Sequence, residues 1–349
     1  MTIRHEQLLA LPHRFNIDAI EAEPLGSGLI NHTWIVRTAR KERFVLQRLH
    51  SMFPTSINED IEVVTAHLEK HGFVTPRLLR TGDGELWVED ESGVWRMMTF
   101  VDGLSLNALE SADQAMEAGA LLGRFHEAIS GLDYEFTNTR PGVHDTERHL
   151  ACLRQAMSDH SDHDSYHQIR PLAEKILAAA DELPILVSMG DRIVHGDPKI
   201  NNFIFDRSSG AALCLVDLDT LGRMPLPLEL GDAFRSWCNP AGEDSTKTGF
   251  SLDYLRAAVS GYAQSSRQWI EDVEWQSIVP ATRIILIELA ARFCTDALAE
   301  QYFGWDPDRF PSRSEHNRVR AEGQLATAAV LGSLSEQAEA IVVESFLKV

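Results

Sequence analysis

The feature that most constrains the fold is a change in residue pattern next to Asp102 and Gly103. Before this point, short β-branched and aromatic runs alternate with glycine turns, which is typical of an antiparallel sheet. After it, apolar residues recur three and four positions apart, which indicates helices. A chain of 349 residues is long enough for two lobes. We therefore predict an α+β architecture with a small β-rich lobe at residues 1–101 and a larger, mainly helical lobe at residues 102–349.

The first lobe is predicted to be an antiparallel sheet with one long helix. A short helix at residues 6–11 is expected ahead of the sheet. The long helix is expected at residues 58–71, because its apolar residues lie three or four apart. Asn58 is its expected N-cap, and Gly72 lies just past its end. The strands are expected at residues 20–25, 33–38, 43–49, 78–80, 86–89 and 95–101.

The second lobe is predicted to be helical, with one hairpin set into it. Ser111 and Gln114 resemble a capping box at the start of its first helix. The hairpin is expected from strands at residues 203–205 and 212–216. Further helices are expected at residues 146–158, 169–182, 252–262, 273–303 and 320–347.

The formal charge of -20 disfavours two kinds of partner. Nucleic acids and anionic membrane surfaces both attract basic proteins, so neither is expected to bind. The four cysteines are scattered without a CxxC pair, which favours a reducing compartment. The N-terminal residues lack the apolar core of a signal peptide, and the best apolar run, residues 284–289, is too short to span a bilayer. We therefore expect a cytoplasmic protein.

The strongest sign of chemistry is the block HGDPKINN, from His195 to Asn202, followed by the predicted hairpin and the segment VDLD. The hairpin would bring Asp197, Asn202 and Asp217 together as a cluster of oxygen ligands, which Mg²⁺ prefers. A carboxylate beside the metal can accept a proton from an attacking hydroxyl. Lys199 lies where an ammonium could reach a transferring phosphoryl group. A positioned base, metal ligands and a cation are the parts that phosphoryl transfer requires.

This pattern resembles the protein-kinase-like superfamily, and within it the aminoglycoside phosphotransferase and choline kinase branch. The glycine after the histidine, and Asp-Leu-Asp in place of Asp-Phe-Gly, are similar to that branch. The resemblance implies a two-lobed kinase fold that uses ATP and Mg²⁺. It implies that the catalytic base is Asp197, that Lys199 contacts phosphate, and that Asn202 and Asp217 bind the metal. Asp219 would be either a further metal ligand or an indirect supporting residue. His195 and Asp232 would support the catalytic loop.

The resemblance also assigns the nucleotide to the first lobe. The turn Gly26-Ser27-Gly28 lies between two expected strands and suits a loop that covers phosphates, because glycine lets backbone N–H groups approach them. Thr99 to Val101 is the expected link between the lobes, where backbone groups would meet adenine. The third strand carries Gln47 where protein kinases carry a phosphate-binding lysine. Glu62, on the helix that follows, is then an indirect supporting residue.

Within that branch, several stretches resemble the N-acetylhexosamine 1-kinases. They lie between residues 24 and 320 and include GSGLIN, FVLQR, GDAFR and EHN. These kinases share the Gln-Arg pair of the third strand. The likeness implies that Arg292 and Tyr302 contact a sugar, whereas Leu29 replaces a polar residue that lies near the sugar.

We therefore expect an ATP-dependent kinase that phosphorylates a hydroxyl of a sugar-like metabolite, with the anomeric hydroxyl of an N-acetylhexosamine as one candidate. Aminoglycoside, choline and homoserine kinases of the same fold are alternatives. Another is a pseudokinase that binds nucleotide and regulates a partner, which Gln47 favours and the complete set of Asp197, Asn202 and Asp217 disfavours. A binding module without nucleotide is a third. The expected partner is a small-molecule acceptor, and the chain could be a monomer or a homodimer.

Overall fold

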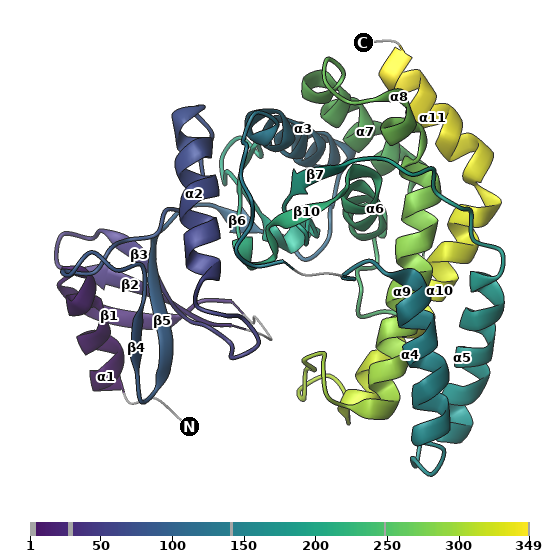
Figure 1. The fold of residues 1–349 in the computed structure, drawn as a ribbon, viewed down its shortest axis with the longest axis horizontal. Coiled ribbons are helices and arrows are strands. Elements are labelled where there is room, and N and C mark those ends of the chain that lie inside the picture. The colour runs from purple at the N-terminus through teal and green to yellow at the C-terminus, as the bar shows by residue number, and fades with distance from the viewer. Residues whose placement is uncertain (1–4, 27–30, 140–141, 248, 348–349) are drawn as a thin grey trace.

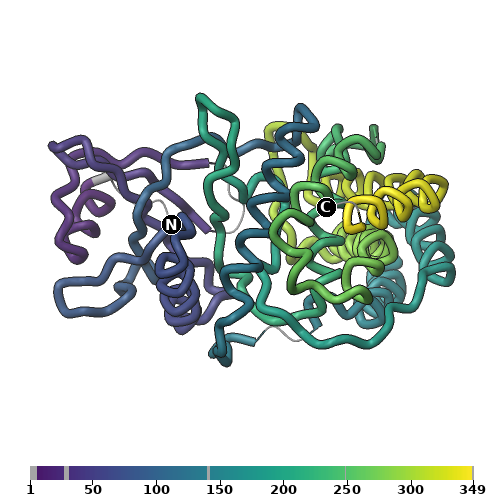
Figure 2. Tube along the Cα trace, turned by 90° about the horizontal axis from the view of Figure 1, so that it is seen from above, coloured from purple at the N-terminus to yellow at the C-terminus, as the bar shows by residue number. Residues whose placement is uncertain are grey.

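The structure, a computed structural model, describes residues 5–26, 31–139, 142–247 and 249–347. It has two lobes side by side, a small lobe built on a sheet and a larger helical lobe (Figure 1). The helices nearest the C-terminus lie at the end of the molecule opposite the sheet (Figure 2). The predicted α+β fold class is therefore confirmed.

The small lobe contains one antiparallel sheet with the strand order β1-β2-β3-β5-β4. One face packs against α1 (His5–Ala10) and the 3₁₀ helix η1 (Leu11–Phe15), which bury Leu8 and Phe15 against strand residues such as Trp95. The other face looks toward α2 (Ile57–Lys70) and the helical lobe. The strands are β1 (Ala19–Pro24), β2 (His32–Thr38), β3 (Arg43–Arg48), β4 (Val88–Asp90) and β5 (Gly93–Thr99).

The N-cap of helix α2 lies two residues before the expected one. Ser56 is its N-cap, and Asn58 lies inside the first turn with its side chain fully buried. Asn58 Nδ2 donates to the carbonyl of Thr55, while Asn58 Oδ1 accepts from Arg96 on β5. The Asn58 side chain, expected to cap the helix, therefore forms a buried hydrogen bond with Arg96 instead. Gly72, at a φ of 73°, follows the helix end as predicted.

The expected strand at residues 78–80 is reduced to a single bridge between Leu78 and Met98. The chain nevertheless runs beside β5 there, because the N–H of Leu79 donates to the carbonyl of Met97 and the N–H of Thr99 donates to that of Arg77. Residues 77–79 therefore pair with β5, but through too few consecutive hydrogen bonds to count as a strand.

The helical lobe contains the predicted hairpin, β8 (Phe203–Phe205) and β9 (Ala212–Leu215), which β6 (Leu104–Ser105) extends. A second pair of short strands, β7 (Asp191–Val194) and β10 (Gly222–Pro225), lies next to it. The 3₁₀ turns are η2 (Ile200–Asn202) and η3 (Leu218–Thr220). The helices are α3 (Ala112–Ile129), α4 (Thr146–Asp159), α5 (Tyr166–Ala180), α6 (Leu226–Trp237), α7 (Leu252–Ser266), α8 (Asp272–Gln276), α9 (Ile278–Ala299), α10 (Arg313–Ser333) and α11 (Ser335–Leu347).

Two helical predictions were wrong in extent, and one helix was missed. The expected helices at residues 273–303 and 320–347 each divide in two, at Ser277 and at Leu334. Helix α6 escaped prediction because its charged residues Glu229, Asp232 and Arg235 are buried, so charge does not mark an exposed face. All three of these side chains belong to the functional site described below.

The two lobes share a continuous apolar core. One cluster of buried residues includes Ile61 and Leu68 of α2 together with Leu121 and Phe125 of α3. Asp60 of α2 strengthens this junction, since its carboxylate accepts hydrogen bonds from the segment after α3. The donors are the hydroxyl of Tyr134, the backbone N–H groups of Thr137 and Asn138, and the side chain of Asn138, at 2.8–3.0 Å. The small lobe is therefore held firmly against the large one.

Helix α9 is apolar on almost every side because other helices surround it within the large lobe. Of the described helices, none is long and apolar enough to cross a membrane.

Asp244 ties α10 to the loop between α6 and α7. Its Oδ1 lies 2.9 Å from His316 Nε2 and 2.7 Å from Arg320 Nε, and its Oδ2 lies 3.2 Å from Arg309 Nη1. Burial alone would raise the pKa of the Asp244 carboxyl, but His316 and Arg320 outweigh burial and hold that pKa well below its usual range. The ionised carboxylate is therefore the form that stabilises the fold.

Replacing Asp244 with Asn should lower the free energy of unfolding by about 1–3 kcal/mol at pH 7, because it removes the charge and leaves the buried guanidinium of Arg320 without its carboxylate partner. Since the folded-state pKa is depressed, the difference between wild type and variant should be complete above about pH 4 and should shrink as pH falls further. Urea denaturation at several pH values measures both. A difference that stays constant from pH 6 to pH 2.5 would contradict the assignment.

Candidate active site

The loop that carries the block HGDPKINN begins where β7 ends, at His195, and other segments hold its backbone. Glu229 of α6 accepts hydrogen bonds from the backbone N–H groups of His195 and Gly196 at 3.0 and 2.9 Å. His195 Nε2 lies 2.9 Å from the carbonyl of Val216, and the hydroxyl of Thr220 donates to the carbonyl of His195. His195 therefore joins the loop to the segment that follows the hairpin.

Gly196 allows the loop to pass very close to η3. Its φ is 83°, in the left-handed region, and a Cβ at this position would lie 2.1 Å from the carbonyl oxygen of Thr220. No other residue type fits without moving the backbone. The glycine in the block HGDPKINN is thus a steric requirement of the loop.

Asp197, Lys199 and Asn202 are brought together as predicted from the sequence. Lys199 Nζ lies 2.7 Å from Asp197 Oδ2, and Asn202 Nδ2 donates to the Asp197 carbonyl at 2.8 Å and to Asp197 Oδ2 at 3.2 Å. Burial would raise the pKa of Asp197, but the charge of Lys199 outweighs it and lowers that pKa below its usual value. The carboxylate is therefore ionised near neutral pH, as a proton acceptor must be.

The hairpin carries Asp217 to the same place. Phe203 on β8 pairs with Leu215 on β9, and the N–H of Val216 then donates to the carbonyl of Asn202 at 2.9 Å. Asp217 follows with a φ of 63°, a left-handed conformation that is unusual for a residue with a side chain and typical of functional sites. Desolvation by neighbouring protein atoms raises the pKa of the Asp217 carboxyl, although the residue is exposed overall, and the negative charges of Asp219 and Asp197 raise that pKa further.

Asn202 and Asp217 offer hard oxygen atoms that suit Mg²⁺. Because Asn202 Nδ2 is engaged with Asp197, its Oδ1 is the atom left to accept or to bind a cation. Asp217 is exposed and lies near the carboxylates of Asp219 and Asp197, so a cation there would compensate the repulsion between them. Within the described ranges, no three His, Cys, Asp or Glu side chains form a metal cage of their own. Asn202 Oδ1 and the Asp217 carboxylate are therefore the oxygen atoms that fit Mg²⁺ here.

Asp219 is placed differently from the metal-binding role expected for it. Its Oδ1 accepts from Arg96 Nη1 at 2.5 Å, and its Oδ2 accepts from Asn31 Nδ2 at 2.5 Å. Arg96 and Asp219 form an ion pair in which each side chain is only 1% exposed. Both carboxylate oxygens thus have protein donors, and Asp219 joins the hairpin to the sheet lobe.

Gln47 lies beside this ion pair. It faces Arg96 directly across β3 and β5, and its Oε1 accepts from both Nε and Nη2 of Arg96. The strand position that holds lysine in protein kinases is therefore the neighbour of a buried arginine. Sequence reasoning missed Arg96, although one charged residue in the apolar run VWRMMTF was a signal that could have identified it.

Glu62 pairs with other arginines and not with Arg96, the partner of Gln47. Its carboxylate pairs with Arg77 at 3.4 Å and Arg80 at 3.1 Å, on the segment that runs beside β5. Asn58, one turn earlier on α2, contacts Arg96 instead, at 3.3 Å. Glu62 therefore takes no part in the buried contacts among Gln47, Arg96 and Asp219.

The expected nucleotide-binding segments border the same region. Gly26 is exposed, has a φ of 74° and directly follows the hydrogen bond between the N–H of Leu25 and the carbonyl of Thr33, whereas Ser27, Gly28 and Leu29 lie outside the described residues. Thr99 ends β5, and Val101 lies in the link to β6, each half-buried. The N–H of Thr99 is already bonded to the carbonyl of Arg77, so it is not free for a ligand.

Asp232 belongs to a group of charged side chains near Asp197 that also includes Arg235 and Glu243. Arg235 Nε donates to Asp232 Oδ1 at 2.8 Å, and its Nη1 pairs with Glu243. Burial raises the pKa of Asp232 despite this arginine. The positive charges of Arg235 and Lys199 both act on Asp197 and favour its ionised form. Asp232 is therefore the hydrogen-bond partner of Arg235, whose positive charge favours the ionised form of Asp197.

Arg292 and Tyr302 lie next to each other in the helical lobe. The Arg292 guanidinium is 5.9 Å from the centre of the Tyr302 ring and 5.7 Å from that of Phe303. Arg292 also lies 3.8 Å from the buried carboxylate of Glu288, which accepts from Thr146 and contacts His144 at 2.9 Å. The roles of Arg292 and Tyr302 as sugar contacts stay a prediction, and the sequence did not point to their neighbours His144 and Glu288.

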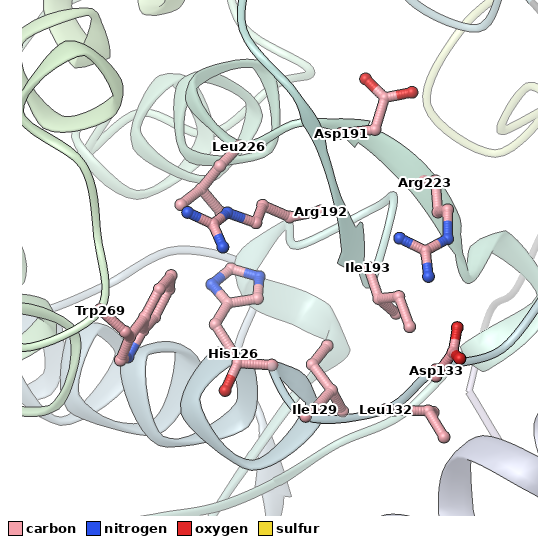
Figure 3. Close-up of a pocket in the computed structure, with 12 residues that line it drawn as sticks. His126, Ile129, Leu132, Asp133, Asp191, Arg192, Ile193, Arg223, Leu226 and Trp269 are labelled. Carbon is pink, nitrogen blue, oxygen red and sulfur yellow. The ribbon is translucent and has the colours of Figure 1, made fainter.

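A separate hollow of about 270 Å³ lies at the other end of β7 from the catalytic loop (Figure 3). His126, Arg192 and Trp269 line one side of it, and His126 Nε2 is 3.6 Å from Glu229. This hollow is distinct from the cluster around Asp197.

Fold and site together define a kinase-like small-molecule phosphotransferase. The sequence profile of the phosphotransferase enzyme family matches residues 21–265, which is most of the chain. The chain therefore belongs to that family and is an enzyme that acts on hydroxyl groups.

Several solved structures have a fold similar to that of this chain. A choline kinase from Cryptosporidium parvum Iowa II is 15% identical, with a TM-score of 0.63 over 98% of this chain and 99% of that chain. A spectinomycin phosphotransferase, solved with ADP and spectinomycin, is 12% identical, with a TM-score of 0.63 over 96% and 100%. A microcompartment-associated aminopropanol kinase is 12% identical, with a TM-score of 0.63 over 96% and 98%. At such low identity these similarities concern the fold alone.

Replacing Gly196 with Ala should lower phosphoryl-transfer activity at least about tenfold and destabilise the protein by about 1–3 kcal/mol, because the new Cβ overlaps the Thr220 carbonyl. The matched control is Gly210→Ala, where φ is 74° but nothing lies within 4 Å. That variant should cost about 1 kcal/mol and keep its activity. Initial rates and denaturant unfolding measure both effects, and equal losses of activity in the two variants would contradict the steric explanation.

Proposed function

We propose that the enzyme transfers the γ-phosphate of ATP to a hydroxyl of a small, sugar-like metabolite. The observation that carries the proposal is the convergence of Asp197, Asn202 and Asp217 on one loop and hairpin. Asn202 contacts Asp197 through its side chain and fixes the strand before Asp217 through its backbone. This unit offers a base and two metal ligands in a fixed relation, which is what phosphoryl transfer needs.

In this mechanism, Asp197 orients the acceptor hydroxyl and accepts its proton. The acceptor oxygen forms a bond to the γ-phosphorus while the bond to the β–γ bridging oxygen breaks, and ADP leaves without a covalent enzyme intermediate. Lys199, 2.7 Å from Asp197, balances negative charge on the transferring group. Asn202 and Asp217 would hold Mg²⁺, which neutralises charge on the ATP phosphates. The Gly26-Ser27-Gly28 turn would cover the phosphates, and Thr99 to Val101 would border the adenine.

The acceptor proposal rests on the charges beyond Asp197. Asp232, Glu243 and Glu288 each have a cationic or histidine partner already, so no unpaired carboxylate among them awaits a cationic acceptor. Arg292 lies over both Tyr302 and Phe303, so these two rings do not form an open cage for a quaternary ammonium group. Alternating donors and acceptors suit a neutral compound with several hydroxyl groups. An N-acetylhexosamine, phosphorylated at the anomeric hydroxyl, is one such candidate.

Asp197→Asn should abolish ATP turnover while Mg-ATP still binds, because the variant keeps the shape of the site and loses the proton acceptor. Asp217→Ala should lower the rate by more than about 10², since metal positioning supplies most of the catalysis. Asp159→Asn, at an exposed position on α4, is the control and should behave as wild type. Near-normal turnover in either site variant would overturn the proposed mechanism.

An acceptor panel tests the substrate class. Purified enzyme with Mg-ATP would be offered N-acetylglucosamine, N-acetylgalactosamine, other hexoses, kanamycin, choline and homoserine, and ADP release would be recorded. We expect the amino sugars or another hexose to stimulate release, and phosphorus NMR of the product would locate the phosphate. Stimulation by choline or kanamycin, without stimulation by any sugar, would contradict the sugar proposal and leave the kinase mechanism in place.

A further inference from the structure

Asp232 lies on the face of α6 that is turned toward the loop of Asp197. Glu229, three positions before Asp232, accepts hydrogen bonds from two backbone N–H groups at the start of this loop, at 3.0 and 2.9 Å. The Ser236 hydroxyl, four positions after Asp232, accepts from the N–H of Ile200 at 3.2 Å. Helix residues three and four positions apart are neighbours on one face, so Asp232 lies between two contacts with the loop.

The Asp232 carboxylate has one oxygen without a donor. Its Oδ1 accepts from Arg235 Nε at 2.8 Å, whereas its Oδ2 has no hydrogen-bond donor among the described residues. The side chain is only 6% exposed, and a buried acceptor without a partner costs free energy unless a ligand or water satisfies it. Oδ2 nevertheless keeps some solvent-exposed area, so a ligand can reach it.

His144 offers a second atom of this kind. Its Nδ1 lies 2.9 Å from the Glu288 carboxylate, and no described residue contacts its Nε2. Burial alone would raise the pKa of Glu288, but His144 and Arg292 outweigh burial and lower that pKa. The ionised carboxylate accepts from Nδ1–H, which leaves a lone pair on Nε2 of the neutral ring. The His144 side chain is 7% exposed, and Nε2 keeps part of that area.

Helix packing brings Asp232 and His144 to the same region. Gly231, next to Asp232, packs so closely on α9 that a Cβ would lie 2.9 Å from the carbonyl carbon and oxygen of Ala281. Glu288 follows Ala281 by seven residues, which is two helical turns, so both lie on the same face of α9. His144 contacts Glu288 on this face.

Electrostatics indicates the same arrangement. Burial has the largest effect on the pKa of Asp232 and raises it, whereas Arg235 lowers it; after these, Asp197 raises that pKa and His144 lowers it. Because Coulomb interactions weaken with distance, Asp232 lies near both Asp197 and His144. Acceptor atoms thus extend outward from the proposed base. A compound with several hydroxyl groups can donate to each of them, whereas a compound with one hydroxyl leaves two unpaired.

We propose that Asp232 Oδ2 and His144 Nε2 bind two further hydroxyl groups of the acceptor, beside the hydroxyl that Asp197 deprotonates. This inference rests on the proposed function and narrows the acceptor to a compound with at least three hydroxyl groups, such as a hexose. Glu288 is then a positioning residue, because it fixes which nitrogen of His144 carries the proton.

Monodeoxy sugars test the inference, because each lacks one hydroxyl. Initial rates with Mg-ATP give kcat/KM for N-acetylglucosamine, N-acetylgalactosamine, glucose, galactose and their monodeoxy analogues. For the sugar that wild type uses best, two analogues should each lose at least about tenfold, since each leaves a buried acceptor unpaired.

Two variants assign these losses to their residues. Asp232→Ala removes Oδ2, and Arg235 keeps Glu243 as its partner. One of the two losses should shrink to less than about threefold in this variant, because the missing hydroxyl no longer has a partner to lose. His144→Asn can still donate to Glu288 but has no atom at the Nε2 position, and the other loss should shrink in the same way.

Glu243→Gln is the matched control, because it perturbs Arg235 from the other side and should keep both losses at their wild-type size. A purely structural role of Asp232 and His144 would lower all rates by one factor and leave both losses unchanged, which would overturn the inference while the proposed function stands. Equal rates for a sugar and all its analogues in wild type would overturn it as well. Turnover of choline or homoserine without any sugar would overturn both the inference and the sugar acceptor, and a folded wild type that forms no ADP with any of these compounds would overturn the proposed function too.

Discussion

The buried ion pair between Arg96 and Asp219 joins the two lobes at the point where the chemistry is proposed to occur. It connects the central part of the sheet, through Gln47, to the hairpin that carries Asp217, and Asn31 completes it from the segment after the glycine turn. A charge pair of this kind tolerates little displacement, because either partner left alone would be a desolvated charge. The distance between the sheet and the β8–β9 hairpin is therefore fixed by electrostatics as well as by apolar packing. The remaining supports, Glu229 under the catalytic loop and Asp60 at the lobe junction, act within this frame.

Most of the fold could be predicted from apolar periodicity and turn residues. The strands β1, β2 and β3 and the hairpin β8–β9 were predicted, because their residues alternate or form short apolar runs between clear turns. Helix α6 could not, since Glu229, Asp232 and Arg235 are buried on it and periodicity rules assume that charges face water. The N-cap of α2 was misplaced for a related reason, because Asn58 serves Arg96 across the structure instead of its own helix. Local patterns fail where a polar side chain serves a distant partner.

The same distinction applies to the site. Asp197, Lys199, Asn202 and Asp217 were found because they lie within one short stretch and one hairpin, so their spacing fixes their geometry. Arg96 was not found, because its importance depends on pairing with Gln47 across the sheet and with a residue 123 positions away. His144 and Glu288 were also missed, since tertiary packing alone brings them beside Arg292. The expectation for Asp219 named the right residue, but its partner is an arginine of the other lobe.

The central claim is that this loop and hairpin move a phosphoryl group from ATP to a small molecule. The most direct measurement uses ATP labelled with ³²P at the γ position, purified enzyme, Mg²⁺ and a dialysable metabolite extract as the source of acceptors. The account predicts that label appears in an organic phosphate, with one ADP formed for each phosphate transferred. A folded protein that binds ATP yet leaves all label in ATP and inorganic phosphate would contradict it.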